Sequence, residues 1–273
     1  MKTKACSLLL LLAFSALVHA DTVSNLVAQG CPSPDREWQA KDYTAFKELL
    51  VKKTLPLPRL ESESGRAVLH RLVDTENLSF HHNRNLPLET RFPDLMNLMD
   101  GEKSIMMLYF RAANAGEKVE KELANLLVFQ LAVASAAVEL TEEFIPTIPK
   151  DEKYEIRMEG FAKMKSGLTT VLHGAVTSLS ERAFYSDESV AKMVRGIHDY
   201  YPRFASLLPE TSKTEFRVKI RDMLAREKNP VVKRELIALI DAMKVEQGGG
   251  APNVGQPIRS ETNSTPSAAG SRR

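Results

Sequence analysis

Apolar side chains recur every three or four residues along most of the chain between residues 35 and 246. The clearest stripe occupies residues 151–181 and is interrupted only at Lys165. Its members are Tyr154, Met158, Phe161, Leu168, Leu172, Val176 and Leu179. This spacing places them on one face of an α-helix, whereas a half-buried strand alternates every two residues. The pattern predicts an all-α protein in which residues 35–246 form an irregular multi-helix bundle.

Capping residues and prolines place the other helices. The expected helices cover 35–53, 64–76, 117–145, 186–202 and 202–208, with two more beginning at 212 and 229. Residues 77–100 contain Pro87 and Pro93 and are expected to form an ordered connection with one helical turn at 94–99. Ile105–Phe110 is continuously apolar, and we assign it to a helix because no partner strand is evident.

The most apolar segment of the body is Leu126–Val138, with Gln130 and Ser135 as its main exceptions. A helix that is apolar almost all round lies inside a packed bundle or a membrane. This stretch is only about 20 Å long at 1.5 Å per residue, and a bilayer core is about 30 Å thick. We therefore expect the central helix of the bundle.

The first twenty residues have the three parts of a secretory signal. Lys2 and Lys4 form a positive start, Leu8–Val18 form an apolar run, and small residues precede a cleavage site after Ala20. The apolar run is too short to span a bilayer, which takes about twenty residues. We expect cleavage, export to the periplasm or the cell exterior, and no transmembrane segment in the mature chain.

Four segments follow from these patterns. Residues 1–20 are the signal peptide, 21–34 a polar lead and 35–246 the helical domain. Residues 247–273 consist mainly of Gly, Pro, Ser, Thr and Asn with little apolar content. Such a segment cannot bury enough surface to order itself, so we expect a disordered tail.

Charge narrows the class of partner. Removal of residues 1–20 leaves 35 basic and 35 acidic side chains, and residues 21–246 hold 32 basic and 34 acidic ones. A neutral body without a basic stripe argues against nucleic acid or an anionic membrane as the main partner. A protein or another macromolecule of the cell envelope or exterior is the expected partner.

Cysteine chemistry is limited to one side chain in the processed protein. Cys6 leaves with the signal peptide and Cys31 stays. An intramolecular disulfide is therefore excluded, and the fold must be held by its apolar core. A lone thiol in an oxidising compartment pairs between chains, pairs with small thiols or stays inert. Cys31 is expected as a free thiol.

The last helices show a weak internal repeat. Val190, Val194, Ile197 and Asp199 align with Val232, Leu236, Leu239 and Asp241 at one offset of 42 residues. That period is in the range of HEAT or armadillo repeats, and Asn229–Arg234 looks like the turn and start of a HEAT second helix. The resemblance covers residues 187–246. Two copies are fewer than the three that such an array needs, so HEAT-like hairpins and chance similarity of amphipathic helices both stay open.

Histidines and acids suggest one candidate metal site. His70, Asp74, His81 and His82 lie close together in the sequence, and imidazole and carboxylate are ligands of zinc. The spacing matches no known zinc motif, and adjacent histidines diverge in most backbone conformations. A solvated loop explains the four residues better, and the sequence indicates no cofactor.

Three glycines repeat at heptad spacing within the 151–181 stripe. Gly160, Gly167 and Gly174 each cost about 1 kcal/mol relative to alanine inside a helix. Close packing of a neighbouring helix is the favoured reason for their presence. A smooth groove for an apolar small molecule is the alternative.

Ser189-Val190-Ala191-Lys192 matches the S-x-x-K pattern of penicillin-recognising enzymes. The companion S-D-N and K-T-G motifs are missing from the sequence, and the sheet of that fold is not evident. A serine and a lysine on a helix surface are the simpler interpretation. No other reaction is indicated by a motif.

These observations favour a non-catalytic binding or interaction protein, because stacked helical pairs build concave binding surfaces. A periplasmic or secreted hydrolase or metal-dependent enzyme is the first alternative, with His70, Asp74, His81 and His82 as candidates. A carrier of an apolar small molecule in the glycine-lined groove is the second.

Overall fold

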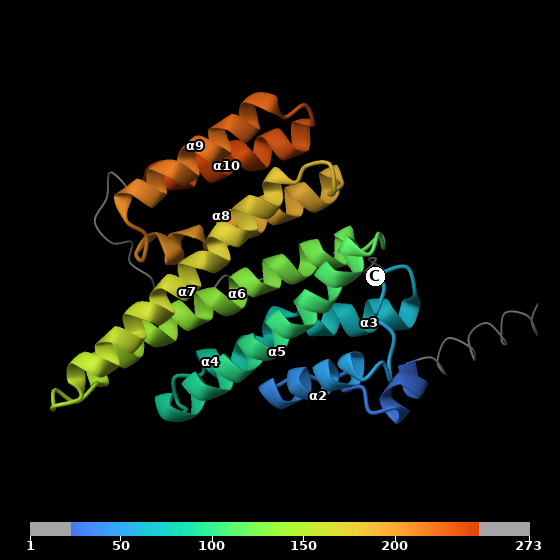
Figure 1. Cartoon of the computed structure of the whole chain (residues 1–273), viewed down its shortest axis with the longest axis horizontal. Helices are drawn as coiled ribbons and strands as arrows, with labels where there is room; N and C mark the ends of the chain where they lie inside the picture. Colours follow the sequence, from blue (N-terminus) through green and yellow to red (C-terminus); the bar gives the residue numbers. More distant parts are fainter. Residues whose placement is uncertain (1–22, 246–273) are drawn as a thin grey trace, which may run out of the picture.

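The computed structural model describes residues 23–245, and this part of the chain contains helices, turns and loops but no strand (Figure 1). A short helix at 23–28 lies within the segment expected as a polar lead. The later elements are α2 Ala40–Val51, α3 Glu63–Leu72, η1 Thr75–Leu78, α4 Ser79–His82, α5 Leu88–Asn114, α6 Glu120–Phe144, η2 Ile145–Thr147, α7 Tyr154–Ser180, α8 Asp187–Ala205, α9 Glu210–Arg226 and α10 Pro230–Val245. The all-α bundle is confirmed. The signal peptide and the tail fall outside the described residues.

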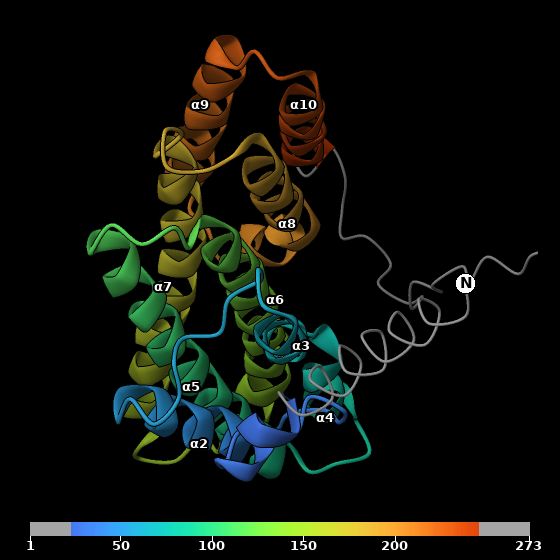
Figure 2. The same cartoon turned by 90° about the vertical axis from the view of Figure 1, so that its right-hand side faces the viewer.

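The longer helices form two rows (Figure 2). In one row α6 packs against α8 and α8 packs against α10, while α7 contacts both α6 and α8, and α9 contacts α10. The second row contains α5, α7 and α9. Its members meet through the Phe92 and Phe161 rings, 6.3 Å apart, and the His173 and Phe216 rings, 4.4 Å apart. Each helix of a row connects to the next through a helix of the other row, so neighbours along the chain are antiparallel.

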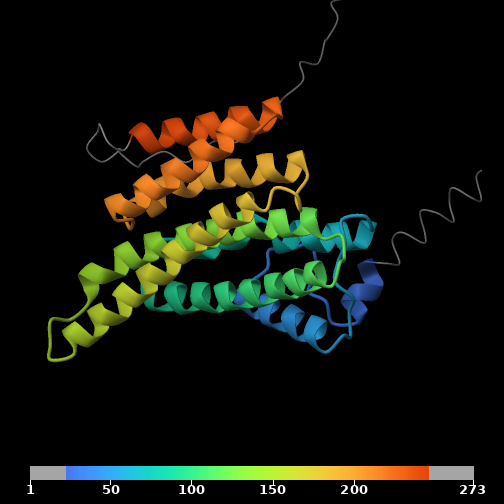
Figure 3. The ribbon, with the colours of Figure 1, turned by 45° about the horizontal axis from the view of Figure 1, so that its top comes forward.

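The first helices close the other end of the stack. α2 packs against α5, and the short elements η1 and α4 contact α6. Figure 3 shows that the turn between α6 and α7 extends beyond the ends of the neighbouring helices. Consistent with this position, Tyr154, Met158 and Phe161 at the start of α7 are only half-buried, whereas the later members of the stripe are buried.

The central position of α6 is confirmed, because 17 of its 25 residues are buried. The helical segment Glu120–Thr147 is nevertheless long and apolar enough to cross a membrane by length and composition, with a mean hydropathy of 1.8 in its most apolar window. The length argument from the apolar stretch therefore does not hold for the whole helix. Burial identifies the role of α6 in this fold, since 83% of that window lies inside the protein.

The 42-residue offset relates two neighbouring helices of one row. Val190 and Val232, and likewise Val194 and Leu236, are fully buried at equivalent positions of α8 and α10. The two helices pack side by side. The repeated spacing therefore reflects repeated burial within the row.

The expectation of an irregular connection over 77–100 is wrong. α5 begins at Leu88 and runs for 27 residues with Pro93 inside it. Pro93 lies in the second turn of the helix. Because proline has no backbone N–H, the hydrogen bond that another residue would donate to the carbonyl of Glu89 is missing. Tertiary contacts offset this loss. Arg91 is 2% exposed, and its guanidinium donates to the carbonyls of Leu86 and His81 at 3.1 and 3.0 Å.

Several helix starts also differ from expectation. The first long helix begins at Ala40 rather than 35, because Asp42 accepts a hydrogen bond from the backbone N–H of Gln39 at 2.9 Å and caps the helix there. α8 continues through Pro202 to Ala205, so 202–208 is not a separate helix. α9 begins at Glu210, two residues before the expected cap at Ser212.

Candidate functional site

The candidate metal residues do not come together in the structure. His70 is exposed on α3, Asp74 caps η1 by accepting a hydrogen bond from the Glu76 N–H at 2.9 Å, and His82 Nδ1 lies 3.5 Å from Glu139 Oε2. Among residues 23–245, no group of three histidine, cysteine or acidic side chains could hold a metal ion. The sequence proximity of these residues is therefore not a spatial cluster.

His81 differs from its exposed neighbour His82 because its side chain is buried. It is 1% exposed, and its Nε2 lies 2.9 Å from Asp94 Oδ2, while Nδ1 is buried without a hydrogen-bond partner in the described part of the chain. Burial lowers the pKa of His81 although Asp94 opposes the shift. The pair resembles a catalytic His–Asp dyad in its connectivity, but the free nitrogen is closed off from solvent and so from a substrate.

The glycine stripe faces outward. Gly160, Gly167 and Gly174 are exposed, and a Cβ atom added at any of them would meet nothing within 4 Å. The favoured explanation, close packing of a neighbouring helix, is therefore wrong for the described chain. Close packing occurs instead at Gly196 of α8, where an added Cβ would lie 2.8 Å from Val128 of α6.

Ser189 and Lys192 have separate partners. Ser189 is 3% exposed and its hydroxyl lies 3.1 Å from that of Ser186, the cap of α8. The Lys192 ammonium donates instead to the side-chain oxygen of Asn125 on α6. Ser189 is therefore buried in the first turn of α8 and not on the helix surface as expected, and Ser189 and Lys192 contact different residues.

Cys31 is free and buried, as its 3% exposure shows. It lines a cavity of about 590 Å³ together with apolar side chains that include Phe46, Leu55 and Val68. Burial raises the pKa of the Cys31 thiol to about 11. The thiolate is the reactive form of cysteine, so this thiol is slow to react near neutral pH.

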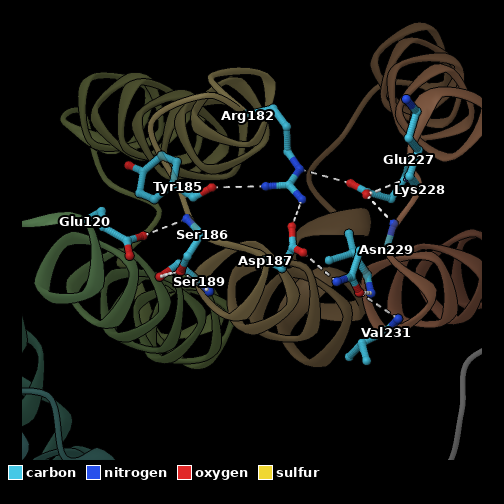
Figure 4. A network of polar contacts seen from close by, with 11 residues as sticks. Glu120, Arg182, Tyr185, Ser186, Asp187, Ser189, Glu227, Lys228, Asn229 and Val231 are labelled. Atoms are coloured by element: carbon cyan, nitrogen blue, oxygen red, sulfur yellow. Dashed lines mark hydrogen bonds and ion pairs between the residues drawn. The ribbon is translucent and has the colours of Figure 1, made fainter.

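Polar side chains link the first turns of α6, α8 and α10 at one edge of the stack (Figure 4). Glu120 Oε2 accepts a hydrogen bond from the Ser186 N–H at 2.8 Å. Asn229 donates from Nδ2 to Asp187 Oδ2 at 2.5 Å, and its Oδ1 accepts from the Val231 N–H at 2.9 Å. The three helices of one row therefore begin side by side, with their amino ends joined by side-chain hydrogen bonds.

Arg182 lies at the centre of this network, in the loop before α8 (Figure 4). Its Nε donates to Glu227 Oε2 at 3.0 Å, its Nη1 donates to the Tyr185 carbonyl at 3.0 Å, and its Nη2 donates to Asp187. The hydrogen bond from Arg182, followed by that from Asn229, lowers the pKa of Asp187. Lowered pKa values keep both carboxylates that Arg182 contacts ionised, and its single positive charge balances one of the two.

Beside this network lies a groove of about 730 Å³. We call it the α7–α9 groove, and its lining residues are Leu179, Ser180, Arg182, Asp187, Lys219, Asp222, Met223, Arg226, Glu227, Lys228 and Asn229. The α9 residues among them are spaced by three and four, so one face of α9 forms a wall of the groove. The end of α7, the start of α8 and the loop between α9 and α10 form the rest.

The α7–α9 groove has an excess of unpaired positive charge. Lys219, Arg226 and Lys228 line it, and their charged groups form no ion pair or hydrogen bond with any side chain of residues 23–245. Asp222 is the lining acid that Arg182 does not contact. Leu179 and Met223 contribute apolar surface between these charges. The arrangement can therefore bind an anionic group next to an apolar one.

The net charge of residues 21–246 conceals this site, because it sums over helices of opposite net charge. Residues 209–245 carry nine basic and six acidic side chains, whereas residues 21–208 carry 23 basic and 27 acidic ones. A separate charge count for each helical pair would have shown the difference. Lys219, Met223 and Arg226 also lie on one face of α9, and their spacing in the sequence was a second signal of this site.

The fold and the groove define an all-α stack with a mixed polar and apolar site at one edge. Comparison with protein-family models, with curated proteins and with solved structures gives no match to this chain. The functional argument therefore depends on the geometry of the groove itself.

Proposed function

We propose that this is an exported, non-catalytic binding protein that holds a partner protein at the α7–α9 groove. One observation carries the proposal: Lys219, Arg226 and Lys228 line a concave site without an acidic partner in the described chain. Unpaired charges around apolar surface give a site orientation and specificity for a charged ligand.

The charged network beside the groove supports binding rather than reaction. A carboxyl group is an effective general acid or base when its pKa lies near the working pH. Asp187 and Glu227 show the opposite shift. For Glu227, burial raises the pKa, but the hydrogen bonds from the Asn229 N–H and from Arg182 outweigh it and leave a lowered value. Both acids stay ionised and serve to fix Arg182 and the helix ends.

The helical stack supplies the frame for such a site. We propose that α7 to α10 act as two HEAT-like hairpins, with α8 and α10 as the paired inner helices. Stacked hairpins expose extended surfaces along their edges, and these surfaces are commonly used to bind other proteins. The edge at which α8 and α10 begin is the one that carries the groove.

A pull-down with matched variants tests this proposal. The mature protein, the groove variant Lys219→Glu/Arg226→Glu and the control variant Arg221→Glu/Lys233→Glu are used to capture proteins from the exported fraction of the cells that make the chain. Arg221 and Lys233 are exposed on α9 and α10 and do not line the groove. We expect one stoichiometric partner with the wild type and the control, and its loss with the groove variant. Equal capture by all three proteins would show that the groove is not the binding site. A turnover assay that detects a reaction would refute the non-catalytic role.

The cavity beside Cys31 favours a second candidate function, the carriage of an apolar small molecule. Its volume of about 590 Å³ is in the range of small-molecule sites, and its lining is mainly apolar. This cavity lies away from the glycine stripe on which the sequence based the same function. Mass spectrometry of organic extracts of the purified protein tests it. A co-purified apolar compound that is lost in Val68→Trp would support the carrier, and extracts without such a compound would count against it.

A further inference from the structure

We infer that the ligand of the α7–α9 groove is an extended acidic peptide segment in which two carboxylates flank an apolar side chain. This inference rests on the proposed function and names the chemistry of the partner. It is argued from charge, from spacing along α9 and from the shape of the site.

Charge complementarity identifies the ligand as anionic. Arg182 pairs with both Asp187 and Glu227, so one negative charge of this network stays uncompensated, and the lining as a whole holds four cations against three acids. Lys219, Arg226 and Lys228 remain against Asp222 and this uncompensated charge, which leaves an excess of positive charge for the guest. Opposite charges placed in this way steer a partner to the site and fix its register more than they add affinity.

The spacing of the cations indicates how far apart the carboxylates lie. Lys219 and Arg226 are seven residues apart on one face of α9, which is about 10 Å along the helix axis at 1.5 Å per residue. In an extended polyproline-type peptide, residues three apart lie on the same side and about 9 Å from each other. Two acidic residues separated by two others therefore match the two cations.

The apolar part of the groove lies between these two charges. Met223 is four residues after Lys219 and three before Arg226, so it occupies the middle of the same wall. Leu179 at the end of α7 adds apolar surface to the lining. Methionine is flexible and polarisable and adapts to different apolar side chains. In a polyproline-type peptide a residue between the two acids projects to a different side, so its apolar side chain would contact Leu179 on the α7 side of the groove, and Met223 would contact the stems of the acids.

The shape of the site favours a peptide over an anionic lipid surface. The cations line a groove bounded by α7, by α9, by the start of α8 and by the loop between α9 and α10. A bilayer surface is flat on this scale and would reach only the rim of a concave site. A narrow extended chain can enter it and place its carboxylates at the walls.

Fluorescence anisotropy with defined peptides tests the inference on the full mature chain. The probe is a labelled peptide with the central sequence Glu-Ala-Leu-Glu, and its matched control has Gln in place of both Glu residues. We expect saturable binding of the acidic peptide that weakens with rising salt, and binding of the Gln peptide that is about tenfold weaker or more. Equal binding of both peptides overturns the inference.

Two charge-matched variants locate the binding. Lys219→Gln/Arg226→Gln removes two cations from the groove, and Arg221→Gln/Lys233→Gln removes two from outside it. The groove variant should weaken binding of the acidic peptide about tenfold or more, and the control less than about threefold, with both variants keeping the helical circular dichroism and melting temperature of the wild type. Equal losses would show a diffuse charge effect and overturn the inference. Met223→Glu, which places an acid between the cations, provides a second groove variant if the first one unfolds.

Further arms separate other sources of negative charge. Inorganic phosphate that displaces the peptide with equal affinity would reveal an unspecific anion site. Vesicles containing phosphatidylglycerol that bind the protein while the peptide does not would identify a membrane contact. Either result overturns the peptide inference. These results test the peptide and not the proposed function. A partner that is captured by the wild type and lost in the groove variant would still support the proposed function even if this peptide did not bind.

Discussion

At the scale of single residues, Glu102 is the least expected side chain of the fold. It is 0% exposed on α5, and both its carboxylate oxygens are buried without a hydrogen-bond partner in the described chain. Burial raises its pKa to about 8. Its neighbour Gly101 lets α2 approach closely, since an added Cβ there would lie 2.8 Å from the Tyr43 Cβ. The carboxyl group is therefore kept neutral inside a tight helix contact.

This burial predicts a specific pH dependence of stability. The folded pKa of Glu102 is raised from 4.5 to about 8, so between these values the unfolded state releases its proton while the folded state keeps it. The contribution of Glu102 to stability is therefore largest below pH 4.5 and falls as the pH rises towards 8. Glu102→Gln removes this contribution. The free energy of unfolding of the variant, relative to that of the wild type, should increase by up to about 1.4 kcal/mol for each pH unit between pH 5 and 8.

Urea unfolding of both proteins at pH 5 and pH 8 measures the effect. The free energy of unfolding of the variant minus that of the wild type should increase from the lower to the higher pH. A difference that stays constant across this range would show that Glu102 is ionised in the folded protein.

At the scale of elements, α5 shows how a tertiary contact determines a helix. Pro87 and Pro93 indicated a connection, and that local signal was outweighed by Arg91, whose guanidinium contacts Glu143 of α6 at 3.2 and 2.5 Å. Sequence patterns predicted the helices whose apolar stripes were continuous, such as α7. They could not predict a pairing between residues 52 positions apart, because no local rule connects Arg91 to Glu143.

The Arg91–Glu143 pair predicts an asymmetry between two substitutions. Arg91 is 2% exposed, whereas the Glu143 side chain is 40% exposed. Glu143→Gln leaves a buried cation without its counter-ion and should destabilise the protein by about 3 kcal/mol. Arg91→Met also removes the donors to the carbonyls of Leu86 and His81, which Glu143→Gln keeps, so it should cost more. Chemical denaturation of the two variants checks the order, and a larger loss for Glu143→Gln would contradict it.

The glycines of two helices predict opposite effects of the same substitution. Gly167 and Gly174 of α7 are exposed with no atom near an added Cβ, whereas Gly196 of α8 contacts Val128. Alanine at Gly167 or Gly174 should stabilise the protein by about 0.5–1 kcal/mol through helix propensity. Alanine at Gly196 should destabilise it, because two packed helices must move apart. Thermal melting of the three variants decides this, and stabilisation by Gly196→Ala would argue against the α6–α8 contact.

At the scale of the whole molecule, two rows of helices bring together residues that are distant in sequence. The all-α class, the central helix and the repeated burial of α8 and α10 could be predicted, because each follows from periodicity within one segment. The candidate site could not be predicted, since it combines Arg182, one face of α9 and the loop between α9 and α10. The weak metal candidates His70, Asp74, His81 and His82 show the opposite case, because they are neighbours in sequence and form no ligand cluster in the described chain.

Net charge differs between the two ends of the stack of helices. The last two helices are basic and the rest of the body is acidic, although the sum over the body is close to neutral. Neutrality of the whole chain argued against nucleic acid and anionic membranes, and it concealed a local excess of positive charge. The groove lies where the basic pair meets the end of α7.

The central claim is that a partner binds in the α7–α9 groove, and methionine methyl NMR tests it most directly. Met223 lines the groove, while Met107 is 43% exposed on α5 and does not line it. The purified protein, labelled with ¹³C at the methionine methyl groups, is titrated with the captured partner or the acidic peptide. The account predicts that the Met223 resonance shifts with saturation while that of Met107 does not. Saturable binding that leaves Met223 unchanged would contradict it.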